Sequence, residues 1–388
     1  RPAPTRGFIY GELPASMRYA DMPELLSDVS NYGPDKLYLI EEVKWRNNYD
    51  GNNTLAAAYA SVNIPFGKFN IYAGVRFEHD RMELVSNTQD HQKSPTSTYY
   101  TFNDFFPSVN ATYRLSDKQQ LRLAYGKSVN RPEFREVSSS VFYDFDLSGN
   151  IQGNPNLTAC YVHNVDLRYE LYPSKSELVS VALFYKNFQN PIEWTYTVAG
   201  GTDPIYSYKN AKGAYSYGVE LDVKKSLDFI GVPDLSLVFN GALIKSKVNF
   251  DKGDQEKNRP MQGQSPYIIN TGLFYQNSRI GLSAALLYNR IGKRIVGVGR
   301  SMGSVDDNVR IPDSYEMPRN AVDINLSKKI GSHFELKLSV KDLLGESVVF
   351  KQFEDGIRLN NGTVKNAEEV TRCYKPGRNY SLSVTYNF

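Results

Sequence analysis

The residues able to do chemistry are four histidines, two cysteines and scattered acids, and their spacing fits neither a catalytic nor a metal-binding pattern. His79 and His91 flank one connection and have the chemistry to bind haem or a metal, although a lone histidine more often does neither. Asp251, Asp254 and Glu256 lack the spacing and the glycine of a calcium loop, so we expect a solvated loop there. With no nucleophile–base set and no phosphate-binding loop, the sequence predicts no enzyme, no cofactor and no resident metal.

One long connection carries aromatic and acidic side chains within a short stretch, between Glu136 and Asn150. Aromatic rings exposed on such a connection are able to stack on a sugar or on an organic iron chelate. The same rings can equally pack the connection against its neighbours, and the sequence leaves both interpretations open. The candidate substrate-contact residues are Phe142, Tyr143, Asp144, Phe145 and Asp146.

Charged side chains alternate with apolar ones along many segments, as between Tyr161 and Glu170. In a strand, successive side chains point to opposite sides, so one face becomes apolar and the other carries charges of both signs. The charged face is able to line a water-filled interior and a substrate path. For any single residue we favour the simpler role of pairing across strands. The candidate inward-facing residues are Arg76, Arg122, Asp166, Arg168, Glu220, Asp222, Lys224, Glu335 and Lys337.

The elements that position these charges are long strands joined by connections of alternating length. Short turns such as Pro65–Lys68 and Ser116–Lys118 alternate with long connections such as Arg131–Ala159 and Gly345–Pro376. Short turns at one end and long loops at the other are typical of outer-membrane barrels, whereas a soluble sandwich has no reason to keep that rhythm. We therefore predict an all-β fold, a transmembrane antiparallel β-barrel with about thirteen strands after Asn52.

Composition agrees with a barrel and excludes other classes. The chain has 28 Tyr, 20 Phe and 2 Trp, and tyrosine suits the boundary between water and lipid. No segment approaches the run of about 18–20 apolar residues that a spanning helix needs. A net charge of +3 without a basic run argues against nucleic acid as a partner.

Thirteen is an odd number, whereas complete bacterial barrels usually have an even number of strands. The sheet is therefore expected to be partial, with the missing strands supplied by an N-terminal part of the same gene product, because open edges in lipid are costly. We divide the chain into an irregular extracellular loop segment, residues 1–51, and a barrel segment, residues 52–388. The C-terminus is expected on the periplasmic side and the long loops outside the cell.

Several stretches resemble the TonB-dependent receptor family, in its Bacteroidetes-type branch, between about Asn52 and Phe388. No single stretch is specific, but their order and spacing over the whole chain are similar to the family's. The residues that carry the resemblance are Ala58-Tyr59-Ala60, Ile64-Pro65-Phe66, Gly74-Val75-Arg76-Phe77-Glu78, Phe106-Pro107-Ser108-Val109, Leu121-Arg122-Leu123-Ala124-Tyr125, Arg131-Pro132-Glu133-Phe134, Gly153-Asn154-Pro155-Asn156-Leu157, Gly218-Val219-Glu220-Leu221 and the terminal Tyr-x-Leu-x-Val-x-Tyr-x-Phe.

The resemblance implies a 22-stranded outer-membrane barrel closed by a plug domain, and active uptake of a scarce nutrient powered by the inner-membrane TonB complex. Partners would be the N-terminal part of the receptor with its plug, outer-membrane lipid and, in one branch, a surface lipoprotein. The inward-facing charges would then hold and release the plug. A passive pore, or a structural, adhesion or assembly component, is the alternative use of the same barrel.

Three further features were assigned local roles. Arg131-Pro132-Glu133-Phe134 is interpreted as a strand exit and loop anchor, because proline ends ladder pairing. Gly153-Asn154-Pro155 is interpreted as turn chemistry. Cys160 and Cys373 are predicted near the extracellular ends of strands, where a disulfide and two separate thiols are both open.

Overall fold

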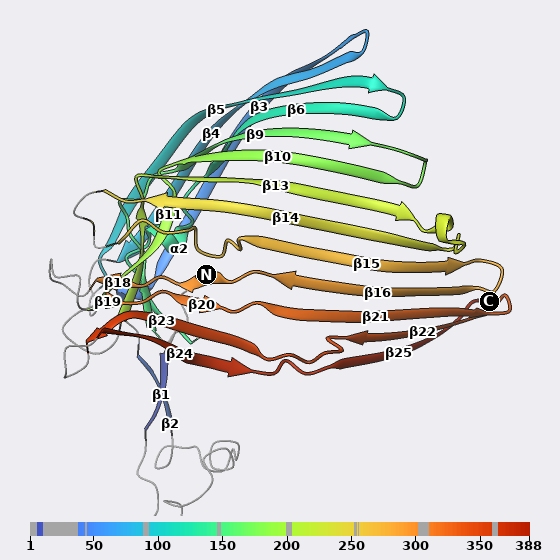
Figure 1. The fold of residues 1–388 in the computed structure, drawn as a ribbon. Coiled ribbons are helices and arrows are strands. Elements are labelled where there is room, and N and C mark those ends of the chain that lie inside the picture. The colour runs from blue at the N-terminus through green and yellow to red at the C-terminus, as the bar shows by residue number, and fades with distance from the viewer. Residues whose placement is uncertain are drawn as a thin grey trace, which may run out of the picture.

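The computed structural model describes residues 6–10, 38–42, 45–87, 93–145, 149–198, 204–251, 254, 256–301, 310–358 and 364–388 (Figure 1). Its main feature is a 13-stranded sheet in which every strand pairs antiparallel with its neighbours in chain order. The predicted strand number is confirmed. The strands are β3 (Tyr49–Phe66), β4 (Phe69–Asn87), β5 (Pro95–Ser116), β6 (Gln119–Asn130), β9 (Cys160–Leu171), β10 (Leu178–Gln189), β13 (Gly213–Ser226), β14 (Leu235–Asn249), β15 (Tyr267–Asn277), β16 (Leu282–Ile291), β21 (Arg319–Ile330), β22 (Phe334–Lys341) and β25 (Asn379–Tyr386).

Connections at the two ends of the sheet differ in length, as predicted. One end has short turns, of which 67–68 and 117–118 are the tightest, and η4 (Asp228–Ile230) lies in another. The other end carries long connections with small sheets of their own (Figure 1). Their strands are β7 (Val141–Asp144), β8 (Gly149–Gln152), β11 (Ile192–Val198), β12 (Pro204–Asn210), β17 (Arg294–Gly297), β18 (Arg300–Ser301), β19 (Arg310–Ile311), β20 (Ser314–Glu316), β23 (Val348–Arg358) and β24 (Val364–Tyr374).

The first 51 residues differ from the irregular loop that we expected. β1 (Arg6–Tyr10) and β2 (Tyr38–Glu42) form an antiparallel pair, and η3 (Trp45–Asn47) precedes the sheet. The first strand of the large sheet begins at Tyr49, before the boundary placed at residue 52, because its ladder with β4 runs on to the pair Tyr49–Ser86.

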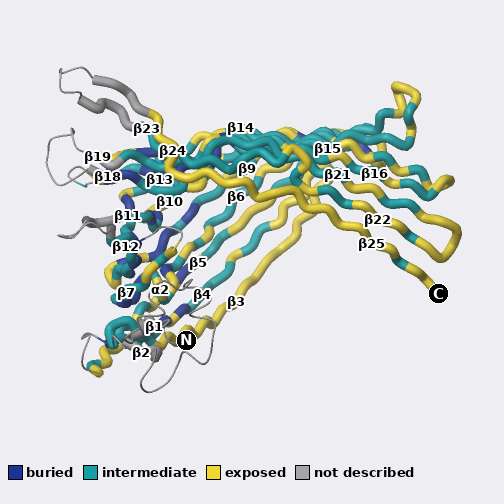
Figure 2. The backbone as a smooth tube through the Cα atoms, turned by 90° about the horizontal axis from the view of Figure 1, so that it is seen from below, coloured by how far each residue is buried: buried dark blue, intermediate teal, exposed yellow. Residues whose placement is uncertain are grey.

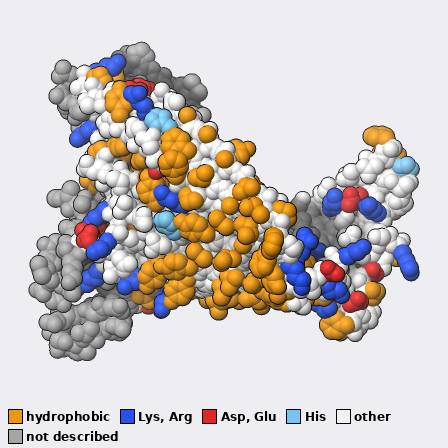
Figure 3. All heavy atoms as spheres, turned by 90° about the horizontal axis from the view of Figure 1, so that it is seen from above, with side chains coloured by type: hydrophobic (Ala, Val, Ile, Leu, Met, Phe, Trp, Pro, Cys, Tyr) orange, Lys and Arg blue, Asp and Glu red, His pale blue; other side chains and the backbone are white. Residues whose placement is uncertain are grey.

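The large sheet has one apolar and one polar face. Large apolar side chains that are exposed in this structure lie at alternating positions on the outer face, for example Leu243 at 63% and Leu382 at 68% exposure. Figure 3 shows an apolar band across the middle of the molecule, with charged side chains gathered at both ends. Such a contiguous exposed apolar surface marks a contact with lipid or protein.

The sheet does not close on itself. Its edge strands are β3 and β25, and each pairs on one side only. Both edges are exposed along most of their length (Figure 2). A partial barrel was expected from the odd strand number, and the open sheet agrees with it.

Deep burial is concentrated at the end with the long connections (Figure 2). There α2 (Phe134–Val137) and the sheet β11-β12-β8-β7 pack on inner-face residues of β4. We call these five elements the loop layer. Its core consists of Met82, Leu84, Val137, Ile151, Leu157 and Tyr208. No helix in the described part of the chain is long and apolar enough to cross a membrane.

Candidate functional site

All nine predicted inward-facing charged residues lie on the inner face. The register shows it directly: Arg122 is opposite Arg168, which is opposite Ala182, which is opposite Glu220. Most of the nine have an ionic partner nearby, on the same or a neighbouring strand, which agrees with the simpler of the two predicted roles. The ion pairs are Arg76–Glu78 at 2.7 Å, Arg122–Glu170 at 3.5 Å, Arg168–Glu220 at 3.8 Å and Lys337–Glu335 at 3.2 Å.

A row of amides crosses the same face. Asp222, Asn240, Asn270 and Asn289 are opposite one another in four successive strands. The Asn240 side chain donates to Asp222, Asn270 donates to Asn240 at 3.3 Å, and Asn289 donates to Asn270 at 2.6 Å. Cross-strand side-chain bonds of this kind fix the register of a sheet. The sequence offered one asparagine per strand and no pairing, so the row was missed.

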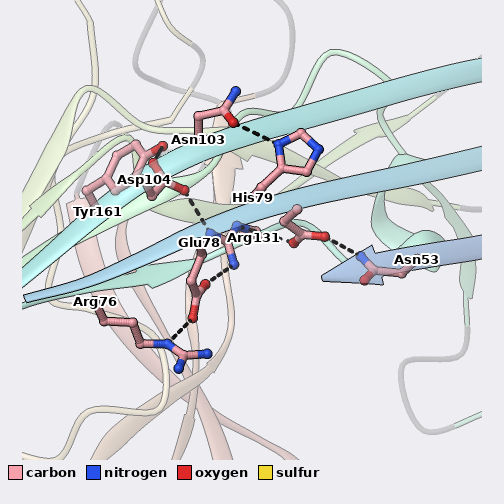
Figure 4. Close-up of polar contacts among 9 residues, drawn as sticks. Asn53, Arg76, Glu78, His79, Asn103, Asp104, Arg131 and Tyr161 are labelled. Carbon is pink, nitrogen blue, oxygen red and sulfur yellow. Dashed lines mark hydrogen bonds and ion pairs between the residues drawn. The ribbon is translucent and has the colours of Figure 1, made fainter. Parts of the chain in front are cut away.

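Arg131 is the centre of a carboxylate cluster on the inner face, under the loop layer (Figure 4). Its guanidinium donates to Glu78 at 2.7 Å and to Asp104 at 2.8 Å, and its Nε lies 3.3 Å from Asp80. The Arg131 side chain is 15% exposed and its three partners are 13% or less. Further hydrogen bonds come from the Tyr161 hydroxyl to Asp104 at 2.7 Å and from Asn53 to Asp80 at 2.8 Å.

This cluster gives the predicted strand exit a physical basis. β6 ends at Asn130, and Pro132 lies two residues beyond it. Arg131 therefore holds the chain to β4 and β5 at the point where it leaves the sheet. The carboxylate contacts were not predicted, because they join residues 27 and 53 positions apart.

Immediately after Arg131 the chain forms α2, and a second glycine-containing segment packs on it. Glu133 and Glu136 form a reciprocal capping box at its start. At Gly153 a Cβ would lie 2.2 Å from the carbonyl oxygen of Ser138 and 2.7 Å from that of Arg135. Only glycine allows this approach, so the residue does more than the turn that was predicted.

Residues beside Gly153 tie the loop layer together. The backbone N–H of Asn154 donates to Glu136 O at 2.6 Å, and its side chain donates to Tyr208 O at 3.0 Å. The Tyr100 hydroxyl donates to Pro155 O at 2.8 Å. One short segment therefore joins α2, β12 and the wall strand β5.

The predicted substrate-contact residues divide into two groups. Phe142 packs against the core of the loop layer, and the Arg135 guanidinium lies 3.6 Å from the centre of its ring. Tyr143 and Phe145 are exposed and meet edge to face at 5.1 Å. Phe142 therefore packs the connection, whereas the other two rings lie at its surface. Asp146 lies outside the described residues.

The long connection between β14 and β15 is clamped onto the β11–β12 hairpin. Arg259 donates to Glu193 at 2.7 Å, with the two side chains 4% and 8% exposed. Burial raises the pKa of Glu193 above its usual value, and Arg259 opposes that change. The Lys209 ammonium lies 2.5 Å from Asp254 and 3.3 Å from Glu256.

These contacts correct the prediction of a solvated acidic loop. Glu256 is buried and accepts a hydrogen bond from Thr195, and Asp254 is paired with Lys209. Asp251, by contrast, is 65% exposed beside Lys212 at 3.3 Å. The acids hold a loop in place because the hairpin supplies their partners, which the sequence could not show.

The remaining predicted residues lie apart from one another. His79 faces outward with its Nδ1 2.8 Å from Asn103 Oδ1, and His91 lies outside the described residues. Cys160 is buried at the start of β9 and Cys373 is exposed in β24; both thiols are free. Within the described part of the chain, no group of three His, Cys, Asp or Glu side chains is placed to hold a metal ion.

A family described as TonB dependent receptor-like, beta-barrel matches residues 5–343 of the chain. Solved structures with similar folds include the ferric-catecholate import receptor Fiu of E. coli, with a TM-score of 0.60 and 16% identity over 90% of this chain and 46% of that one. The ferric citrate transporter FecA gives 0.60 and 14%, over 88% and 46%. The ferric yersiniabactin uptake receptor FyuA of Yersinia pestis gives 0.56 and 16%, over 88% and 47%.

The chain thus spans about half the length of these three structures. At such low identity the likeness concerns the fold. No curated protein sequence matches the chain.

Proposed function

Because the chain belongs to the TonB-dependent receptor family through its β-barrel region, we propose that it forms about half of the wall of a receptor that takes up a scarce nutrient by active transport. Family membership implies an outer-membrane location. The observation that carries the proposal is the sheet itself, apolar outside, polar inside and covered at one end by a packed loop layer. The Bacteroidetes-type branch stays a prediction.

The proposed orientation places the long connections outside the cell and the short turns in the periplasm. Outer-membrane barrels have short periplasmic turns and longer extracellular loops. The C-terminal residues lie with the short turns, since the Asn387 N–H donates to His333 O at 2.8 Å beside the turn between β21 and β22.

The proposed partners follow from the two open edges and the polar inner face. Unpaired backbone groups in lipid cost several kcal/mol each, so further strands, supplied by the N-terminal part of the same receptor, must pair with β3 and β25. That part would carry the plug, which meets the inner-face charges and connects to the inner-membrane TonB complex. Outer-membrane lipid covers the apolar face, and a surface lipoprotein is a further partner for the long connections.

Substrate contact is proposed for the exposed part of the aromatic connection. Tyr143 and Phe145 present ring surface, and Asp144 lies between them in sequence. They are carried on a packed base formed by α2 and β8, so little ordering is needed when a ligand binds. The identity of the nutrient is left open by these residues.

Two measurements on the protein from detergent-solubilised outer membranes test the proposal. Intact-mass analysis should find a tightly bound polypeptide, or a longer chain, that carries a plug. In planar lipid bilayers the same preparation should show no steady conductance, because the plug closes the barrel. A stable barrel of this chain alone with a steady ion current would refute active transport and favour the passive pore.

A further inference from the structure

A pocket of about 100 Å³ lies in the long connections, apart from the exposed rings of Tyr143 and Phe145. It is bounded by the β11–β12 hairpin, the turn that precedes β15, and β17 with the residue after it. The lining residues are Trp194, Thr195, Tyr206, Gln262, Val296, Gly297 and Val298. Aromatic and apolar walls with a few fixed polar groups are typical of small-molecule sites.

The aromatic wall is held rigidly. The Trp194 ring lies 4.6 Å from that of Tyr208, which is buried in the core of the loop layer. Tyr206 meets Trp194 edge to face, at 6.3 Å and 81°. Both rings pack against the core, so they offer a fixed flat surface to a ligand.

Gln262 supplies the polar group and is also fixed. It lies in a turn closed by a hydrogen bond from Gln264 N–H to Met261 O at 3.2 Å, with Gly263 at φ +76° as a type II turn requires. The turn is fastened to β17 by the hydrogen bond from Gly263 N–H to Ile295 O at 2.8 Å. The Gln262 side chain therefore enters the pocket from a stiff base.

The amide of Gln262 is half satisfied. Its NH₂ group donates to Val296 O at 2.9 Å, which sets the orientation of the amide because only the nitrogen can donate to a carbonyl. Its Oε1 is buried and accepts no hydrogen bond from the described residues. A buried acceptor without a partner costs about 1–3 kcal/mol, so a ligand that brings a donor gains from meeting it.

The surrounding charges exclude anions. The Thr195 hydroxyl is already used as a donor to Glu256. Burial raises the pKa of Tyr206, and the negative charge of Asp144 raises it further, so Asp144 acts on the pocket wall. The pocket thus combines acceptors and negative field with flat apolar walls.

We propose that this pocket binds a flat, ring-sized, uncharged group that presents one hydrogen-bond donor to Gln262 Oε1. A cavity of about 150 Å³ lined by apolar side chains binds benzene, so a pocket of this size that is open on one side admits a single ring. The proposal rests on the proposed function for its meaning, because the ring would be one part of the nutrient that the receptor recognises.

The test compares phenol, which has a donor, with anisole, which lacks one. The receptor is placed in lipid nanodiscs and titrated by ligand-detected NMR, with empty nanodiscs subtracted. Phenol should bind about three- to tenfold more tightly than anisole, as expected for one neutral hydrogen bond. Equal affinities in the unmodified protein would overturn the proposal without any variant.

Variants then assign the difference to one atom. Gln262→Met should remove the preference for phenol while anisole still binds, which also shows that the pocket is intact. The matched control is Gln264→Met, two residues away and outside the pocket lining, and it should keep the full preference. Equal loss in both variants would overturn the assignment to Gln262. Binding needs no energised transport, so a passive pore would fail the conductance test and still pass this one.

Discussion

Replacing Arg131 by methionine should loosen the loop layer far more than the same change at Arg122 on the same strand. Arg131 is 15% exposed and neutralises three carboxylates that are 13% exposed or less. Removing one partner of a buried ion pair costs about 3–5 kcal/mol, and the slight exposure places Arg131 near the lower value. Arg122 is 50% exposed and lies 3.5 Å from Glu170, a contact worth about 0–1 kcal/mol.

Hydrogen–deuterium exchange of α2 and β8, followed by mass spectrometry, measures this difference. A loss of about 3 kcal/mol raises the exchange rate of protected amides about a hundredfold, since about 1.4 kcal/mol corresponds to a factor of ten. The strands near the short turns should exchange as before in both variants. If Arg131→Met raises exchange in α2 and β8 no more than Arg122→Met does, the cluster does not fasten the loop layer and the reasoning is wrong.

Three further predictions concern the same layer. Gly153→Ala should destabilise it by about 1–3 kcal/mol, because the added Cβ meets backbone carbonyls, whereas Gly126→Ala, with nothing within 4 Å, should stay within about 0.5 kcal/mol; exchange of β8 reports both. Glu193→Met and Arg259→Met should each cost about 3–5 kcal/mol, and the double variant much less than their sum, in a double-mutant cycle followed by urea unfolding. A hydrogen bond from its lysine partner holds the pKa of Asp254 below its usual value, so this contact stabilises the loop above the ordinary carboxyl pKa and is lost as the pH falls through the lowered pKa. Asp254→Asn should weaken that acid-dependent loss of stability, and an unchanged pH profile of the urea midpoint would contradict it.

Alternation in the sequence was sufficient to predict the sheet and its inner face. A strand has two sides, so fixing the side of Arg168 also fixes that of Asp166, and the ladder carries the choice to Glu220. The side of every charged residue could therefore be predicted before its partner was known. Which charges pair could not, because pairing depends on the register between strands.

The loop layer could not be predicted in the same way, although β4 contained a signal. Along its inner face the side chains change from Arg76, Glu78 and Asp80 to Met82 and Leu84. A polar face that becomes apolar toward the long-connection end requires an apolar cover there. The cover is built from α2, β8, β11 and β12, whose short irregular segments have no period to read.

The inner face and the loop layer are held by contacts of different strength, and the difference suits their proposed roles. Arg168 and Glu220 lie 3.8 Å apart at 38% and 40% exposure, so separating them costs little, and the inner face can exchange such partners for those of a plug. The Glu193–Arg259 pair is buried and expensive to break, so the loop layer keeps its shape while that exchange takes place. A rigid layer above a wall with weakly paired charges allows a plug to move without loss of the surface that recognises the ligand.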